Sequence, residues 1–249
     1  MINSATFSLS STRAAESLVW INPGATALTR ILSGRSNAFL LTGGGKNILV
    51  DTGPAMMWNT LNKRLVKLNI HTLDYLVLTH SHFDHAANAK RIKLLFGAKV
   101  FIHQSESDCL GNGINSVTKG TNFLYRFFVG FLNRSIAGFL TFDPCDHDYL
   151  VDSEFSFRDE GLNVYILHTP GHTAGSVSVI IDDEIALVGD CMFGIFKNSI
   201  FPPVAAEPEI MVSSWGKLLD TGCTIFLPSH GSADIRSLVE REYNKRKKD

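Results

Sequence analysis

The stretch that decides both the fold and the chemistry of this chain is Thr79-His80-Ser81-His82-Phe83-Asp84-His85. It places three histidines and one aspartate within six positions, directly after an apolar run. Imidazole and carboxylate groups are ligands for zinc and related metals, and four of them this close together rarely serve another purpose. A solvated polar turn is the alternative interpretation. The pattern predicts a metal site.

The spacing of these residues predicts how the metal is held. The preceding residues 73–78 are mostly apolar and predict a buried strand. Side chains two positions apart in an extended segment point to the same side, so His80 and His82 can bind one ion together. Residues 86–95 favour a helix that begins near Asp84, and neighbours at such a turn point in different directions. Because one tetrahedral zinc ion needs only three or four protein ligands, Asp84 and His85 are predicted to face a second ion.

Other ligand-type residues follow predicted strands elsewhere in the chain. An ordinary hydrogen-bonded loop residue is the better interpretation of each one alone. Function commonly collects on loops at strand ends, however, and the whole set, taken in order, favours a shared site. The segments are 47–50 before Asp51, 162–167 before His168 and His172, 185–189 before Asp190, and 225–227 before His230.

Asp51, the cluster at 80–85, His172, Asp190 and His230 resemble the five sequence motifs of the metallo-β-lactamase superfamily, over nearly the whole chain. The resemblance implies an α/β fold, an αββα four-layer sandwich with the metals at one edge of its two sheets. It implies a single domain, 1–249, with an apolar helical insertion around 104–150. It also implies two divalent metal ions, with zinc as the first choice and iron or manganese as alternatives.

The resemblance assigns the metal ligands by group. The first ion is expected to take His80, His82 and His172, and the second Asp84, His85 and His230, with Asp190 bridging both. Asp51 is expected to orient the site from behind. The ions would share a hydroxide that attacks a carbonyl group, with Asp84 and Asp190 as the catalytic residues and Asp84 also passing a proton.

Within the superfamily, residues 169–173 and the pair Gly189-Asp190 are similar to glyoxalase II and to N-acyl homoserine lactonases. His82 stands where the diiron oxidoreductases have Glu, and Asp190 stands where true β-lactamases commonly have Cys or Ser. The resemblance therefore implies a metal-dependent hydrolase of a small, partly apolar ester, thioester or lactone. A phosphodiesterase or nuclease of the same superfamily, and a non-catalytic ligand sensor that has kept its metals, are the alternatives.

Composition sets the expected partners and location. The net charge of −1 argues against a nucleic-acid groove and favours a small-molecule substrate. The four cysteines show no CxxC spacing and predict reduced thiols in a cytoplasmic protein, with Cys191 a buried neighbour of Asp190. The first residues lack a basic region followed by an apolar run, so no secretory signal is expected.

Two apolar segments concern the substrate side. Residues 121–140 approach the length of a membrane span, but Arg126, Asn133 and Arg134 interrupt them, so no transmembrane segment is predicted. A helical lid, a homodimer face and a membrane-surface segment are the alternatives. Residues 192–203 are predicted to form an apolar wall near the metals. Lys197 in this wall either points into solvent or meets an anionic group of the substrate.

Overall fold

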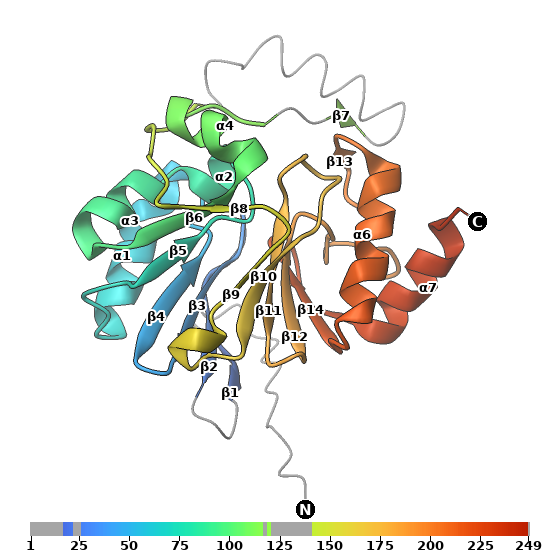
Figure 1. The fold of residues 1–249 in the computed structure, drawn as a ribbon, viewed down its shortest axis with the longest axis horizontal. Coiled ribbons are helices and arrows are strands. Elements are labelled where there is room, and N and C mark those ends of the chain that lie inside the picture. The colour runs from blue at the N-terminus through green and yellow to red at the C-terminus, as the bar shows by residue number, and fades with distance from the viewer. Residues whose placement is uncertain (1–16, 22–25, 117–118, 121–140, 249) are drawn as a thin grey trace, which may run out of the picture.

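Two β-sheets packed face to face form the centre of the molecule, with helices on the outer side of each (Figure 1). The computed structural model describes residues 17–21, 26–116, 119–120 and 141–248, with only the backbone at 17–21 and 119–120. The layers follow the order helix, sheet, sheet, helix. The predicted αββα sandwich is therefore confirmed.

The first sheet has seven strands in the order β1-β2-β3-β4-β5-β6-β8. Neighbours from β1 to β4 are antiparallel, and those from β4 to β8 are parallel. Its inner strands read as continuous apolar runs because both faces of the sheet are covered. The strands are β1 (Ser17–Ile21), β2 (Ala27–Leu32), β3 (Ala38–Gly43), β4 (Lys46–Val50), β5 (Tyr75–Val77), β6 (Lys99–His103) and β8 (Tyr149–Val151).

The second sheet has six strands in the order β15-β14-β12-β11-β10-β9. All its neighbours are antiparallel except β12 and β14, which are parallel. The strands are β9 (Glu154–Ser156), β10 (Val164–His168), β11 (Val177–Ile181), β12 (Ile185–Gly189), β14 (Ile225–Pro228) and β15 (Asp234–Ile235). A separate antiparallel pair joins β7 (Lys119–Gly120) to β13 (Val204–Ala205).

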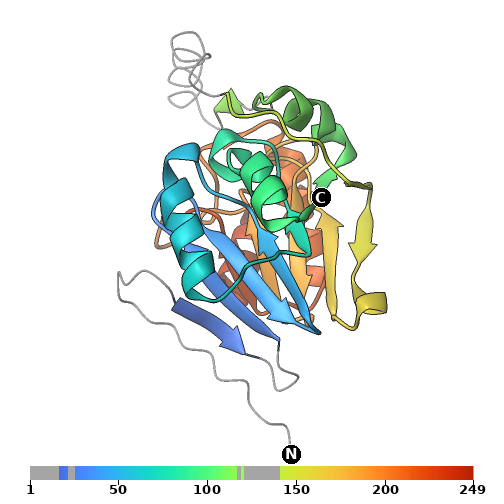
Figure 2. The same cartoon turned by 90° about the vertical axis from the view of Figure 1, so that its left-hand side faces the viewer.

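Three apolar cores bind the layers together. The first lies between the two sheets and includes Val50 and Val179, the second lies under the helices of the first sheet, and the third lies under those of the second sheet around Trp215. Figure 2 shows α1 and α3 in front of the first sheet. The helices are α1 (Trp58–Lys67), α2 (Phe83–Ala86), α3 (Ala89–Phe96), α4 (Ser107–Asn112), α6 (Pro208–Asp220) and α7 (Arg236–Arg246), with 3₁₀ turns η1 (Ala55–Met57), η2 (Gln104–Glu106) and η4 (Arg158–Glu160).

This topology brings five strand ends to one edge of the sandwich. β4 and β5 run parallel in the first sheet. In the second sheet β11 is antiparallel to both β10 and β12, and β12 is parallel to β14, so β10, β12 and β14 all end on the same side. The loops after these five strands carry the ligand-type residues. The edge predicted to hold the metals is therefore where these loops meet.

The helix predicted over 86–95 differs from the observed structure. The chain forms α2 and α3 with a break at Ala87 and Asn88. The Asn88 side chain donates to the carbonyls of Thr52, Gly53 and Pro54, and its amide donates to the Thr52 hydroxyl. These bonds tie Asn88 to the loop after β4, which a propensity argument cannot foresee.

Other predictions concern residues that the structure describes only in part or not at all. The described part of the insertion around 104–150 contains η2 and α4, whereas the apolar segment 121–140 lies outside the described residues. Its alternatives as a lid, a dimer face or a membrane-surface segment stay predictions. Among the helices of the described residues, none is long and apolar enough to cross a membrane.

Candidate metal centre

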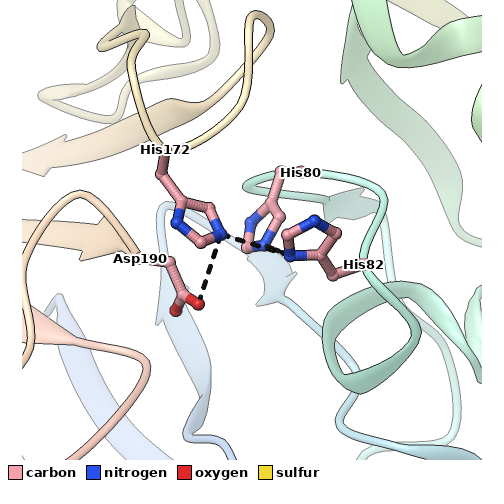
Figure 3. Close-up of side chains that lie close together, drawn as sticks. All are labelled: His80, His82, His172 and Asp190. Atoms are coloured by element: carbon pink, nitrogen blue, oxygen red, sulfur yellow. Dashed lines mark hydrogen bonds and ion pairs between the residues drawn. The ribbon is translucent and has the colours of Figure 1, made fainter. Parts of the chain in front are cut away.

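The first group of ligand-type side chains consists of His80, His82, His172 and Asp190, which converge from three loops (Figure 3). His82 Nδ1 lies 2.9 Å from His80 Nε2 and 3.2 Å from His172 Nε2. Asp190 Oδ2 lies 3.5 Å from His172 Nε2. All four residues are buried. One ligand atom from each lies within 4.8 Å of the others, so a single ion can contact all four.

The second group consists of Asp84, His85 and His230 and lies directly beside the first. His230 Nε2 lies 3.3 Å from Asp84 Oδ2. Asp190 again takes part, because its Oδ1 lies 3.5 Å from His85 Nε2 and its Oδ2 lies 3.4 Å from His230 Nε2. Asp190 therefore stands between the two groups and contacts both.

Hydrogen bonds on the outer side set the tautomers of His82 and His172. His82 Nε2 lies 3.1 Å from the Ser116 carbonyl, and His172 Nδ1 lies 2.9 Å from the Val204 carbonyl. A carbonyl only accepts, so each of these nitrogens carries the proton. The opposite nitrogens, His82 Nδ1 and His172 Nε2, consequently present unprotonated lone pairs to each other.

The same logic holds for His80 and His85. Thr79 Oγ1 donates to Asp51 and therefore accepts from His80 Nδ1, while His85 Nδ1 donates to Asp51 Oδ2 at 2.8 Å.

Lone pairs facing one another without a hydrogen between them repel. His85 Nε2 and Asp190 Oδ1 are, moreover, buried without a hydrogen-bond partner among the described residues. Cations at the two groups would satisfy all these atoms, and the nitrogen and oxygen donors suit zinc. The residues present therefore fit two metal ions.

The histidine pKa values are shifted in opposite directions in the two groups. Burial holds the pKa of His80 well below that of free imidazole and lowers the pKa of His172 to about 4, so both are neutral at pH 7. Burial acts in the same direction on His230, but the carboxylates of Asp190 and Asp84 outweigh it and raise its pKa to about 10. Burial alone would raise the pKa of Asp190, but His230 and His85 hold it well below its usual range. Ionised carboxylates thus favour positive charge at this edge.

Asp51 holds the centre from behind. Its carboxylate accepts from the Thr79 amide and hydroxyl, both at 2.8 Å, and from His85 Nδ1. The residue is 1% exposed and has a φ of 59°, a left-handed conformation that is uncommon for a non-glycine residue. The role that the resemblance gave to Asp51, orienting the site, agrees with these contacts.

The loop that carries His172 is fixed by a close approach to α6. Gly171 has a φ of 129°, and a Cβ there would lie 2.2 Å from the Met211 amide nitrogen. Ser214 also donates to the Pro170 carbonyl at 2.7 Å. Only glycine fits this position. The Pro-Gly-His sequence therefore supplies a ligand and also allows the backbone to pack against α6.

Three residues near the candidate ligands, Cys191, His168 and Lys197, lie outside both groups. Cys191 is fully buried, as predicted, and burial raises the pKa of its thiol to about 12. His168 stacks on His103 at 3.9 Å and belongs to neither group. In the loop after Asp190 the Phe193 ring lies 4.7 Å from the His230 ring, whereas Lys197 is exposed and lines a separate surface cavity of about 540 Å³ with Asp234.

Sequence reasoning missed Glu106. This carboxylate is 1% exposed and accepts from Ser81, which lies between two candidate ligands. The sequence offers only an acidic residue three positions after His103, which is typical of a solvated helix start. Its burial depends on loops far away in the chain.

Comparisons with known proteins agree with the geometry. The sequence model of the Metallo-beta-lactamase superfamily matches residues 33–230. A probable metallo-hydrolase of Methanocaldococcus jannaschii is 32% identical over 158 residues, which cover 64% of this chain and 68% of that protein. A beta-lactamase-like protein 2 homolog of Caenorhabditis elegans is 28% identical over 229 residues, which cover 86% of this chain and 64% of that protein.

A more distant relative carries a more specific name. The atrochrysone carboxyl ACP thioesterase of Aspergillus fumigatus is 22% identical over 217 residues, which cover 86% of this chain and 56% of that protein.

The fold has matching solved structures. A metallo-beta-lactamase of Cronobacter sakazakii superposes with a TM-score of 0.65 at 17% identity and covers 94% of this chain and 91% of its own. At this identity the likeness shows the fold alone. It confirms the predicted fold. The family match over 33–230 and the metallo-hydrolase relative confirm the predicted metal-dependent hydrolase, and the chain belongs to the metallo-beta-lactamase superfamily.

Proposed function

We propose that the protein is a two-metal hydrolase that cleaves a small, partly apolar ester, thioester or lactone. The observation that carries the proposal is the position of Asp190, whose two oxygens lie 3.4–3.5 Å from histidines of both groups. His80, His82 and His172 would hold the first ion, and Asp84, His85 and His230 the second, with Asp190 shared. Zinc suits this donor set, with iron and manganese as alternatives.

The two groups divide the chemistry between them. When bound, a pair of divalent ions supplies a water of lowered pKa and polarises the carbonyl that is attacked. Asp190 keeps the two positions adjacent. Asp84, with 20% of its side chain exposed, lies at the open side, where it would accept the proton lost by the attacking water and pass it to the leaving group.

The open side also suggests how the substrate lies. His230 and Asp84 are the partly exposed members of the seven candidate ligands, so the carbonyl would approach from the second group. The Phe193 ring beside His230 supplies an apolar surface for the acyl or alkyl part. The thioesterase name of the Aspergillus fumigatus relative supports an acyl thioester within the proposed class.

A phosphodiesterase or nuclease remains the second candidate because the same His and Asp pattern serves phosphate diesters. The net charge of −1 speaks against a phosphate-rich polymer as substrate. The cytoplasmic location, the absence of a nucleic-acid partner and a homodimer through 121–140 are predictions that stand with this proposal.

The test is metal content by elemental analysis of untagged protein, followed by turnover of matched substrates. We expect close to two ions per chain and hydrolysis of nitrophenyl esters, acyl thioesters or lactones above that of bis-nitrophenyl phosphate. A preference for the phosphate diester would favour the second candidate. Two ions without turnover of any activated substrate would favour a ligand sensor, and no metal after reconstitution would overturn the proposal.

A further inference from the structure

Glu106 is a buried carboxylate next to the metal centre that none of the proposed steps uses. It lies at the end of η2 and is 1% exposed, and no arginine or lysine of the described residues bonds to it. Glutamate is almost never this buried unless its charge is satisfied. Its partners therefore indicate its purpose.

Within the described part of the chain, donors from three separate segments satisfy Glu106. The Ser81 amide donates to Oε2 at 3.0 Å, and the Ser81 hydroxyl bonds the same oxygen. The Ser116 hydroxyl also bonds Oε2, and the Gly175 amide donates to Oε1 at 3.3 Å. Burial alone would raise the pKa of Glu106, but the hydrogen bonds from Ser116 and Ser81 lower it. The carboxylate is thus ionised and joins the loops that carry His82 and His172.

The segment Asn115-Ser116 lies along the ligand loop and contacts three consecutive residues of it. Asn115 Oδ1 accepts from the Phe83 amide at 2.7 Å, the Ser116 carbonyl accepts from His82 Nε2 at 3.1 Å, and the Ser116 hydroxyl lies 2.7 Å from the Ser81 hydroxyl. The carbonyl bond makes His82 Nδ1 the unprotonated nitrogen. We name Glu106, Asn115 and Ser116 the ligand clasp.

The third segment, the loop that contains Gly175, packs tightly against the Glu106 side chain. A Cβ at Gly175 would lie 2.5 Å from Glu106 Cγ, so the loop between β10 and β11 packs directly on the carboxylate. A shift of Glu106 would therefore move Ser116, and with it the carbonyl that orients His82. The bonds run from Glu106 through Ser116 to a candidate ligand.

We propose that the ligand clasp is a positioning device for the first metal ion, which holds His82 with Nδ1 toward the ion. The inference rests on the proposed function, because it needs His82 to be a ligand. It assigns no chemical step to Glu106. Among the described residues, the clasp's nearest hydrogen bond to the second group is that of Asn115 with the Phe83 amide, beside Asp84, so the effect should fall on the first ion.

The experiment compares wild-type protein with Glu106→Gln and Asn115→Ala. Their matched controls are Glu209→Gln, at an exposed glutamate, and Asn112→Ala, at an exposed asparagine. Each ion's affinity is measured by chelator competition with zinc. The cobalt-substituted proteins are then compared by visible absorption, and the exchange of the His82 Nε2 proton with water is followed by NMR.

We expect Glu106→Gln to weaken the first ion by about 10–100-fold, the range for residues that orient metal ligands, with the second ion changed much less. The cobalt spectrum of the first site should shift, and the His82 proton should exchange faster. Asn115→Ala should act in the same direction, less strongly, and it keeps the test available if Glu106→Gln does not fold.

Unchanged first-ion affinity and spectrum in both variants would overturn the inference, as would equal loss of both ions, which indicates a general structural defect. A wild-type protein that binds no metal would instead defeat the proposed function. The two failures are therefore distinguishable.

Discussion

The two candidate metal groups share Asp190 but differ in how the protein holds them. In the first, three neutral imidazoles lie buried, and each has its outer nitrogen bonded to a carbonyl or hydroxyl. In the second, histidines are paired with carboxylates, and Asp84 and His230 keep 20% and 15% of their side chains exposed. A closed neutral set favours tight, permanent binding, whereas an open charged set favours exchange and contact with substrate. The second position is therefore expected to be the working one.

The largest effect should come from the residue that belongs to both groups. Asp190→Ala removes the shared carboxylate and leaves the surrounding histidines to repel, so we expect less than one ion per chain. We expect kcat/KM to fall on the order of 10³-fold or more. Asp220→Ala, at an exposed end of α6, is the control and should leave both unchanged. Retention of two ions in Asp190→Ala would contradict the bridging role.

The next effect separates the groups. His230→Ala should release the second ion and leave close to one per chain, because all four members of the first group, Asp190 included, are intact. His172→Ala removes a ligand of the first ion outright, so the first position should empty, Asp190 should lose its fixed place between the groups, and less than one ion per chain should stay bound. Elemental analysis after dialysis measures the difference. Equal metal contents in the two variants would mean that the closed and open groups do not differ in the way proposed.

Acid should remove the ions in a fixed order. His230 has a pKa raised to about 10, so below that pH a metal ion must displace a proton, and affinity falls up to tenfold per pH unit for each proton. His172 has a pKa lowered to about 4, so it offers no competing proton above about pH 5. Between pH 8 and 6 the second ion should therefore weaken while the first stays bound. Zinc titrations at several pH values measure this, and simultaneous loss of both ions would contradict it.

The smallest effect concerns Asp234, a buried carboxylate without the histidine neighbours that Asp190 has. Burial raises its pKa to about 7, and its Oδ2 has no hydrogen-bond partner in the described part of the chain. The fold favours the protonated form, so Asp234 destabilises the protein as pH rises from about 4 through 7. Asp234→Asn should raise the free energy of unfolding by roughly 1–2 kcal/mol at pH 8 and by almost nothing at pH 4. Thermal unfolding at both pH values, with metal content as a control, measures this difference. An equal gain in the free energy of unfolding at pH 4 and pH 8 would exclude ionisation of Asp234 as the cause.

Local sequence determined a large part of this molecule. Alternating and continuous apolar runs marked β4, β10, β12 and β14 to within a few residues, because burial on both faces demands apolar side chains. The spacing of His80 and His82 placed both on one side of an extended segment, and the structure has their ring nitrogens 2.9 Å apart. These features depend only on backbone geometry over a few residues.

Tertiary structure decided what joins distant segments. His172 meets His82 across 90 positions because β10, β12 and β14 end at the same edge as β5, and Asp190 falls between the groups for the same reason. The break at Asn88 and the burial of Glu106 depend on loops that no local pattern reveals. The partners that orient His82 and His172 are backbone carbonyls of Ser116 and Val204. Every residue has a carbonyl, so the sequence determined which side chains could bind metal, and only the packed fold determined which way they point.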